Sequence, residues 1–474
     1  MIVLDKPLET RFEALIKEHC DAQKQLGIPA TVFLLIGSRI GDDLYVAHVA
    51  KCPLPETAMD QPESDDTTRK TPTMTPKAPN ETIDPEWITD HGRQVLRTLP
   101  GGVDIIGLML FAEKKLLLQG TFRSILLRAL KMLSTASSTV NWMRLKPSEN
   151  LMALMTLEVP LGKPSGGIVD LAKGSDVFQT KVAFQPVQWV GVRATLQMDL
   201  KLRVPRSSGN TNFLRLFIAS IGDWAKSLLS NNFAIVNGRI RDGSDLITEK
   251  SSGKVSGKAK GRQSQQNQNA NELVDVELFM KLADKVSSVV SDSCCSVVLK
   301  STLKCRAAVL SKATVDAAVN AVKQDAIRSL YSRAELHCES MAVVEDEEKD
   351  TAAVHQLPRR VSTPLPFQSA ILISDYLFEG DSVQDAKDSF RDLLSVEIDS
   401  AAIDDSLERL ITEDDLEAMN VSMPQPVPDS PRTQQITKTA LMEERTLTAS
   451  YVAVAALVAI LAVTVYVVFL SLGK

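Results

Sequence analysis

A run of twenty residues without a charge, Gly or Pro lies close to the C-terminal end of the chain. It reads YVAVAALVAILAVTVYVVFL and extends from Tyr451 to Leu470. As a helix it would be about 30 Å long, which matches the hydrocarbon core of a bilayer. We therefore predict a transmembrane tail anchor over residues 450–472, with the preceding chain on the cytosolic side. The predicted span includes Tyr451, Leu457, Leu461, Tyr466 and Leu470.

The overall composition favours a cytosolic globular body and no nucleic-acid partner. The chain has 474 residues, of which 44% are hydrophobic and 24% charged, and its net charge is −6. Such a chain lacks the excess of Lys and Arg that binding to nucleic acid requires. The N-terminus has no basic segment followed by an apolar one, so we predict no secretory signal. The six cysteines are scattered, which fits reduced thiols better than disulfides.

Hydrophobic periodicity and low-complexity segments divide the chain into regions. The fold class that they predict is α/β (α+β), because strand-like and helix-like patterns alternate through the cytosolic body. Two segments between the folded regions are too polar to form a core, one of them basic and the other acidic. The predicted regions are an α/β domain over 1–145 with a mobile loop over 53–85, a β-rich continuation over 146–241, a disordered basic linker over 242–271, a second α/β region over 272–395, and an acidic disordered tether over 396–449.

The N-terminal region contains the most regular patterns. Ala30–Ile36 and Asp43–Ala50 predict two strands of a hairpin, with a turn at Gly41-Asp42. Glu86–Leu99 predicts an amphipathic helix, and the nearly continuous apolar run Val103–Ala112 predicts a central buried strand. A Pro-Gly-Gly sequence separates this helix from this strand. The candidate structural motif of this segment consists of Trp87, His91, Leu99, Pro100, Gly101, Gly102 and Gly107.

In the region after residue 272, the sequence predicts fewer strands and helices. Ser296–Leu310 predicts a strand, and Lys312–Leu336 predicts a helix with apolar residues in register. Leu365–Tyr376 predicts one more strand, and Asp381–Leu394 a short helix. These elements complete the predicted second α/β region.

The sequence predicts no catalytic residue, no metal site and no cofactor. A thiol nucleophile needs a histidine nearby in space, and the candidate thiols are Cys52 and Cys338. Neither is placed in a Gly-rich entry from a strand to a helix. Zinc needs three or four ligands at short spacings, and the sequence has no Cys-x-x-Cys or His-x-His. His91 lies on the apolar stripe of its helix, which favours a hydrogen-bonded core residue over a ligand.

Several segments, in the same order along the chain, resemble the odorant-response (odr-four-like) family of single-span membrane proteins. The longest is WITDHGRQVLRTLPGGVDIIGLMLF, in which a helix ends in Leu-Pro-Gly-Gly before an apolar strand. The resemblance implies a non-enzymatic role at the endoplasmic reticulum. It implies two kinds of partner, namely G-protein-coupled receptors and the ubiquitin-fold-modifier cysteine protease. The matching segments are Trp87–Phe111, Phe33–Gly37, Leu303–Asp325, and Leu365-Pro366 leading into Ser374-Asp375-Tyr376.

The order of elements over residues 30–112 also resembles metalloprotease-like MPN domains. In active members of that family, a His-x-His zinc pair follows a Gly of the central strand. In this chain the corresponding histidines would fall near Leu110 and Ala112, after Gly107. Apolar side chains cannot ligate zinc. The resemblance therefore implies an MPN-like domain without a metal site.

The function that these observations favour is a non-enzymatic, tail-anchored adaptor of the endoplasmic reticulum membrane. It would recruit the ubiquitin-fold-modifier protease and support receptor trafficking, and its anchor would contact membrane lipid. One alternative is a receptor-export chaperone that binds immature G-protein-coupled receptors directly. A second alternative is a thiol hydrolase that uses Cys52 or Cys338.

Overall fold

The computed structural model describes much of the predicted cytosolic body. The predicted anchor with Tyr451, Leu457, Leu461, Tyr466 and Leu470 lies outside the described residues, as do the tether from residue 409 and most of the predicted loop and linker. No helix of the described part is both long and apolar enough to cross a bilayer. The described ranges are 1–54, 83–117, 120–138, 151–160, 163–205, 213–231, 233–248, 273–279, 293–343 and 356–408.

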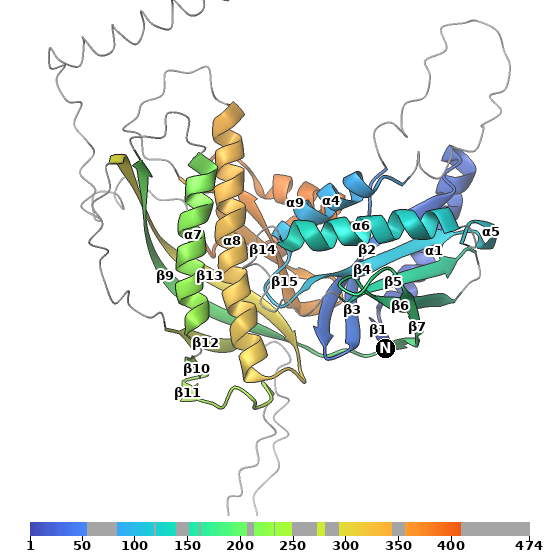
Figure 1. The fold of residues 1–474 in the computed structure, drawn as a ribbon, viewed down its shortest axis with the longest axis horizontal. Coiled ribbons are helices and arrows are strands. Elements are labelled where there is room, and N and C mark those ends of the chain that lie inside the picture. Colours follow the sequence, from blue (N-terminus) through green and yellow to red (C-terminus); the bar gives the residue numbers. More distant parts are fainter. Residues whose placement is uncertain are drawn as a thin grey trace, which may run out of the picture. The chain divides into compact units, whose positions relative to one another are not determined.

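The N-terminal part of the body is built on an eight-stranded mixed sheet with the order β7-β6-β5-β4-β2-β3-β1-β8 (Figure 1). The predicted hairpin and the predicted central strand are confirmed as β2, β3 and β4. The strand β4 lies between β2 and β5, and both of its faces are buried, which explains its continuous apolar run. The strands are β1 (Ile2–Asp5), β2 (Ala30–Ile40), β3 (Asp43–Lys51), β4 (Asp104–Ala112), β5 (Leu151–Glu158), β6 (Pro164–Asp170), β7 (Val177–Thr180) and β8 (Val182–Gln185).

The two edges of this sheet meet at Lys181. This residue alone separates β7, which pairs with β6, from β8, which pairs with β1. The carbonyl of Lys181 accepts a hydrogen bond of 2.9 Å from the amide of Ile2. One extended segment thus joins both edges, so the sheet curls back on itself and leaves few unpaired strand groups there.

Helices cover both faces of the curled sheet. The helix α1 (Leu8–Leu26) buries Leu8, Phe12 and Leu15 against one face. The helices α4 (Pro85–Thr98), α6 (Gly120–Ser138) and α9 (Val383–Leu394) pack against the opposite face. A short helix α5 (Lys114–Leu117) precedes α6 (Figure 1). Asp84 caps the N-terminus of α4, because its carboxylate accepts a hydrogen bond of 2.9 Å from the amide of Glu86.

A second sheet has the order β11-β10-β12-β9-β13. The strands β9 and β13 pair over almost their whole length, and the helices α7 and α8 lie side by side over this sheet (Figure 1). The helix α7 falls within the predicted β-rich continuation, where no helix was expected. The bounds are β9 (Trp189–Pro205), α7 (Phe213–Ser230), β10 (Ala234–Val236), β11 (Arg239–Ile240), β12 (Val274–Leu278), β13 (Ser293–Leu310) and α8 (Val315–Val343).

A hairpin of β14 (Arg359–Leu365) and β15 (Gln368–Leu377) packs against β9, β13 and α4. The single strand predicted over Leu365–Tyr376 is therefore wrong at its start, because a two-residue turn at Pro366-Phe367 interrupts it. A short 3-10 helix, η1 (Ser400–Ala402), follows α9. All described residues belong to one compact unit. The residue boundaries predicted for separate domains stay predictions.

Candidate interaction site and the buried joint

The predicted Leu-Pro-Gly-Gly motif lies against α8 and β13, far from it in sequence. The amide of Gly101 donates to Oδ1 of Asp325 at 3.2 Å and to the carbonyl of Arg306 at 3.3 Å. The carbonyl of Gly101 accepts the amide of Ala308 at 2.9 Å. A Cβ on Gly101 would lie only 1.8 Å from the carbonyl oxygen of Ala321. The glycine is thus required by close contact with the backbone of α8.

Gly102 is a second position at this contact where only glycine fits. Its φ is +82°, a conformation that L side chains rarely adopt, and a Cβ there would lie 2.4 Å from the carbonyl oxygen of Ala308. Its amide donates to Oε1 of Gln324 at 2.9 Å, and Nε2 of the same side chain donates to Asp104 at 3.2 Å. The turn and the first residue of β4 are therefore both held by α8.

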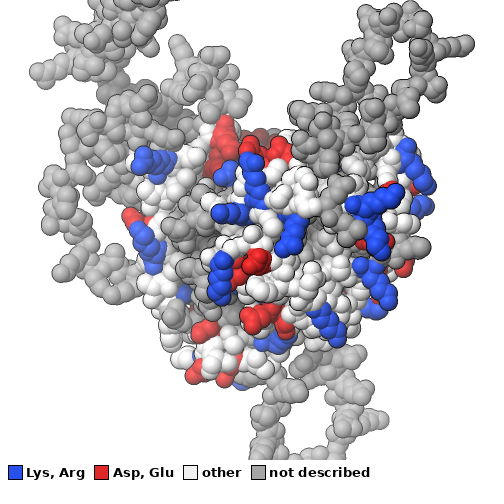
Figure 2. Space-filling model, turned by 45° about the vertical axis from the view of Figure 1, so that its right-hand side comes forward, with Lys and Arg blue, Asp and Glu red and all other residues white. Residues whose placement is uncertain are grey.

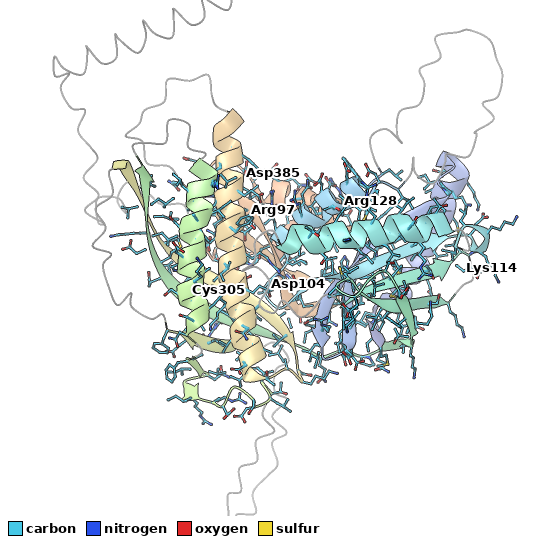
Figure 3. All side chains as sticks on the ribbon, in the orientation of Figure 1. Arg97, Asp104, Lys114, Arg128, Cys305 and Asp385 are labelled. Atoms are coloured by element: carbon cyan, nitrogen blue, oxygen red, sulfur yellow. The ribbon has the colours of Figure 1, made fainter. Side chains whose placement is uncertain are left out.

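Arg328 of α8 satisfies the carbonyl groups at the end of α4 and in the turn that follows. Its Nη1 donates to the carbonyls of Leu99 at 3.2 Å, Pro100 at 3.3 Å and Val103 at 3.0 Å. Its Nη2 pairs with the carboxylate of Asp104. A guanidinium can serve several acceptors at once because its donors form a rigid planar fork. Figure 3 shows Asp104 beside α8.

A buried ion pair continues this contact toward the β14–β15 hairpin. The guanidinium of Arg360 binds Asp325 through two bonds of 2.7 and 2.9 Å, and the side chains are 4% and 1% exposed. Burial opposes the charge of Arg360, but Asp325, Tyr376 and Glu408 together outweigh burial and raise the pKa of this guanidinium. A second pair joins Arg333 of α8 to Glu408 at 2.8 Å. We call this set the α8 joint: Leu99, Pro100, Gly101, Gly102, Asp104, Gln324, Asp325, Arg328, Arg333, Arg360 and Glu408.

The other motif residues have separate structural roles. Gly107 allows β4 to approach β5, because a Cβ there would lie 2.3 Å from the carbonyl oxygen of Ala153. Leu110 and Ala112, at the positions implied for zinc ligands, are buried in the apolar core. Within the described ranges no three His, Cys, Asp or Glu side chains gather as a metal site would require. The MPN-like interpretation itself stays a prediction.

Burial lowers the pKa of three histidines, His19, His48 and His91, so the stability of the fold depends on pH, and the lowered values of His48 and His91 lie near 4. Burial lowers the pKa of His48 to about 4, although its Nε2 donates to the carbonyl of Leu394 at 2.7 Å. Burial also lowers the pKa of His91 to about 4, and its Nε2 has no hydrogen-bond partner among the described residues. His91 is thus a core residue, as predicted, but that nitrogen is not satisfied.

We expect the folded protein to lose stability between pH 7.5 and pH 5. Unfolded histidines bind protons below about pH 6.5, whereas His48 and His91 stay neutral in the fold down to about pH 4. Their contribution is present above pH 6.5 and falls as the pH falls toward 4. The loss at pH 5 should be about 2 kcal/mol per histidine by proton linkage. Denaturant unfolding at both pH values measures it.

Replacement of His91 by Gln removes one of these titrating groups. The difference in unfolding free energy between pH 7.5 and pH 5 should then shrink by about 2 kcal/mol. An unchanged difference in both His91→Gln and His48→Gln would show that these imidazoles do not govern the pH dependence.

The candidate thiols are in surroundings that suppress their reactivity. Burial raises the pKa of Cys52 and of Cys305 well above the ordinary thiol value. Burial, with the nearby Glu339, also raises the pKa of Cys338. A thiol nucleophile instead needs a lowered pKa and an accessible sulfur atom. The surroundings of the two candidate thiols, Cys52 and Cys338, therefore give no support to the hydrolase alternative.

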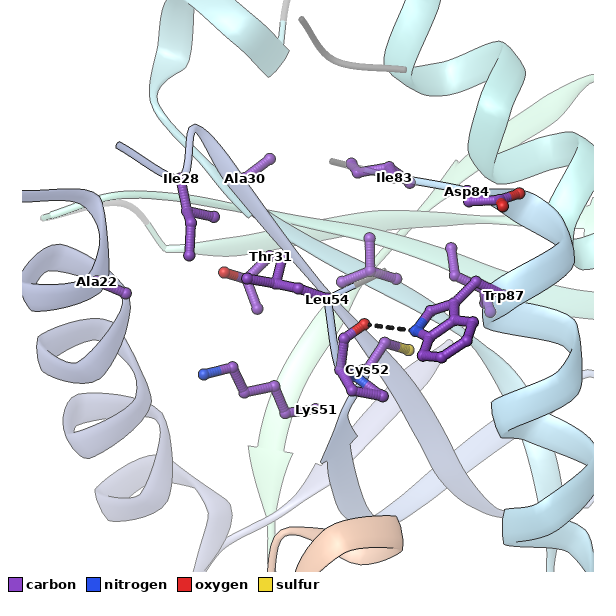
Figure 4. A pocket seen from close by; sticks show the side chains of 13 residues that line it. Ala22, Ile28, Ala30, Thr31, Lys51, Cys52, Leu54, Ile83, Asp84 and Trp87 are labelled. Carbon is purple, nitrogen blue, oxygen red and sulfur yellow. Dashed lines mark hydrogen bonds between the residues drawn. The ribbon is translucent and has the colours of Figure 1, made fainter. Parts of the chain in front are cut away.

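A small surface pocket lies beside Cys52 and Trp87 (Figure 4). It encloses about 440 Å³ of space, part of it open to solvent. The indole Nε1 of Trp87 donates to the carbonyl of Pro53 at 3.0 Å, so this motif residue holds the end of β3 against α4. Most of the lining is apolar, with Lys51 and Asp84 as the charged residues. The pocket offers no pair of groups suited to acid–base chemistry.

The exposed surface of α5 and α6 is basic. These two helices contain no Asp or Glu, and five of their Lys and Arg side chains reach solvent. Figure 2 shows Lys and Arg side chains gathered toward the right-hand part of the face. A surface of this kind attracts acidic groups over several ångströms. The exposed basic residues are Lys114, Lys115, Arg123, Arg128 and Lys131.

This fold and this site define a class of mixed α/β proteins, in which two sheets are joined through a buried helix with polar side chains. Within that class, the chain belongs to the odorant response abnormal 4-like family, whose model matches residues 33–405. The resemblance found in the sequence is thus confirmed. The match includes the Leu-Pro-Gly-Gly turn and the α8 helix that holds it.

Relatives are found in a nematode and in mammals. Odorant response abnormal protein 4 of Caenorhabditis elegans is 28% identical over 430 residues, which cover 88% of this chain and 83% of the relative. The protein odr-4 homolog of Mus musculus is 25% identical over 403 residues, which cover 81% of this chain and 83% of the relative. The protein odr-4 homolog of Homo sapiens is 26% identical over 338 residues, or 67% of this chain and 70% of the relative.

Among solved structures, UfSP from C. elegans can be aligned with this chain, and the alignment covers 84% of this chain and 56% of the UfSP chain. The TM-score is 0.39 and the sequence identity is 7%. A likeness at this level does not establish a shared fold.

Proposed function

We propose that this chain is a membrane-anchored adaptor of the endoplasmic reticulum. It holds the ubiquitin-fold-modifier cysteine protease at the membrane surface and thereby supports the trafficking of receptors. The observation that carries the proposal is the family match over residues 33–405. The apolar run Tyr451–Leu470 supports the membrane anchor, because its length suits a bilayer. The buried thiols support a binding role over a hydrolytic one.

The physical basis of such an adaptor is confinement. A partner bound to an anchored body stays within reach of membrane substrates, so its effective concentration there rises without any change in its chemistry. The α8 joint serves this role by making the two sheets one body, so that a partner held by either sheet is fixed relative to the whole. The basic surface of α5 and α6 suits acidic groups on the partner or on lipid.

Deletion of residues 451–474 tests the proposal. The truncated chain and the protease should both move from the membrane fraction to the cytosolic fraction, because the predicted span that anchors the chain in the bilayer has been removed. Fractionation of cells with and without the deletion measures the distribution of both proteins. A protease that stays with the membrane when the truncated chain is cytosolic would contradict recruitment.

A second function is direct binding of immature G-protein-coupled receptors. The predicted span carries Ala453, Ala455 and Ala456, and small residues let transmembrane helices approach closely. Under this alternative, exchange of the span for an unrelated one abolishes receptor delivery, whereas protease recruitment is unaffected.

A further inference from the structure

The turn between β14 and β15 presents an aromatic side chain in an unfavourable backbone conformation. Leu365 pairs with Gln368, so Pro366 and Phe367 form a two-residue turn. The φ of Phe367 is +69°, and its side chain is 75% exposed. This position of a turn normally carries Gly or Asn, because Cβ is disfavoured there. A bulky residue with positive φ is a genuine outlier.

Elsewhere the described chain uses suitable residues for this conformation. Gly27, Gly41 and Gly102 adopt positive φ, and Asn237 does so in an Asn-Gly turn. Ser395, at the end of α9, is small. Phe367 is the one large apolar residue with positive φ in the described ranges. Neither the core nor the turn explains it, because the ring is exposed and Gly would fit the turn better.

The surroundings hold the turn rigidly. Pro366 fixes its own φ, which presets the first position of the turn. Next to the turn, Nε2 of Gln368 donates to the carboxylate of Asp5, which is 2% exposed. The same carboxylate accepts the amide of Val187 at 3.2 Å. Backbone strain persists only where the surrounding structure determines the conformation, and such positions cluster at binding sites.

We propose that Phe367 is an anchor residue that inserts into an apolar pocket of a protein partner. For the identity of that partner, the proposal rests on the proposed function, which names the ubiquitin-fold-modifier protease. Aromatic anchors contribute much of the affinity of protein interfaces, and a rigid presentation lowers the entropy lost on binding. Close to Phe367 in the sequence, Pro364 is exposed and Pro366 is partly exposed, so both add to the apolar surface of the hairpin.

A protein pocket explains the strained turn better than a lipid bilayer does. A pocket has a fixed shape, so a ring held in one orientation binds more favourably than a mobile one. A fluid bilayer accepts an aromatic ring in many orientations, and a rigid turn then brings no advantage. The free-energy cost of the positive φ is therefore offset by a gain in binding free energy only when the target itself has a fixed structure.

The test compares full-length variants, solubilised in detergent, for affinity toward the purified protease and for thermal unfolding. Phe367→Asn and Phe367→Gly remove the ring but suit the turn, and Phe367→Tyr retains an aromatic ring. Phe178→Ala is the matched control, because Phe178 is 67% exposed on the edge strand β7 and its φ is not positive.

We expect Phe367→Asn and Phe367→Gly to weaken protease binding at least tenfold with an unchanged or higher unfolding temperature. Phe367→Tyr and Phe178→Ala should stay within about threefold of wild type. If the wild-type chain binds the protease and Phe367→Asn binds it equally well, the anchor is overturned and the proposed function stays intact. If Phe367→Asn loses self-association but keeps protease binding, the protease anchor is also overturned, and the ring binds a second copy of this chain instead. No binding by wild type would overturn both proposals.

Discussion

Substitution of Gly101 by Ala should destabilise the body by more than about 4 kcal/mol, at the extreme of single substitutions. The added Cβ would lie 1.8 Å from the carbonyl oxygen of Ala321 and 2.8 Å from the amide nitrogen of Asp325. Both atoms are backbone of α8 and cannot move without shifting the helix. The hydrogen bonds from Gly101 to Asp325 and Arg306 would lengthen at the same time. Denaturant unfolding of purified protein measures the loss.

Gly120→Ala is the matched control. A Cβ on Gly120, the first residue of α6, meets no atom within 4 Å, so its stability should change by less than about 1 kcal/mol. Equal unfolding midpoints for Gly101→Ala and Gly120→Ala would show that the turn does not contact α8 as described.

Replacement of Asp325 by Asn should destabilise the body by about 3–5 kcal/mol, because it leaves the charge of Arg360 buried and unpaired. Oδ1 of Asp325 also accepts a hydrogen bond from the amide of Gly101 at 3.2 Å, and Oδ2 accepts one from the amide of Arg306 at 2.8 Å. Asn keeps only one of these two oxygens, so one of the two amides then faces a donor in place of an acceptor. Asp223→Asn is the control, since the pair Asp223–Lys226 is largely exposed. That change should alter the unfolding free energy by less than about 1 kcal/mol.

A double substitution separates the two causes of this loss. Asp325→Leu with Arg360→Met removes both charges, and apolar replacement of a whole buried pair is often neutral. It should recover much of the stability lost in Asp325→Asn. If Asp325→Asn unfolds at the same denaturant concentration as wild type, the buried pair does not hold β14 to α8.

The local patterns of the sequence predicted three central strands of the N-terminal sheet, β2, β3 and β4. Its strands alternate or run continuously according to how many faces are buried, and Gly41, with φ +58°, forms the predicted turn. The helix α7 was missed although Phe217, Ile221 and Leu228 recur at helical spacing and are all buried. The surrounding strand-like segments outweighed that signal. The turn at Phe367 was missed because Phe does not favour positive φ.

The contact between the Leu-Pro-Gly-Gly turn and α8 could not be predicted from local patterns, because its partners are more than 200 residues apart in sequence. One signal was present within α8 itself. Asp325, Arg328 and Arg333 are charged residues within a helix that also carries many apolar residues, and all three are buried. Charges in such a helix need partners in neighbouring elements, and here they bind the Leu-Pro-Gly-Gly turn and β14.

Redirecting the anchor tests the adaptor role most directly. In cells, the run Tyr451–Leu470 is replaced by a tail anchor that inserts into the mitochondrial outer membrane, with residues 1–450 unchanged. Microscopy then locates the ubiquitin-fold-modifier protease relative to both organelles. We expect the protease to follow the altered chain to mitochondria. A protease that keeps its original location while the altered chain covers mitochondria would show that this body does not recruit it.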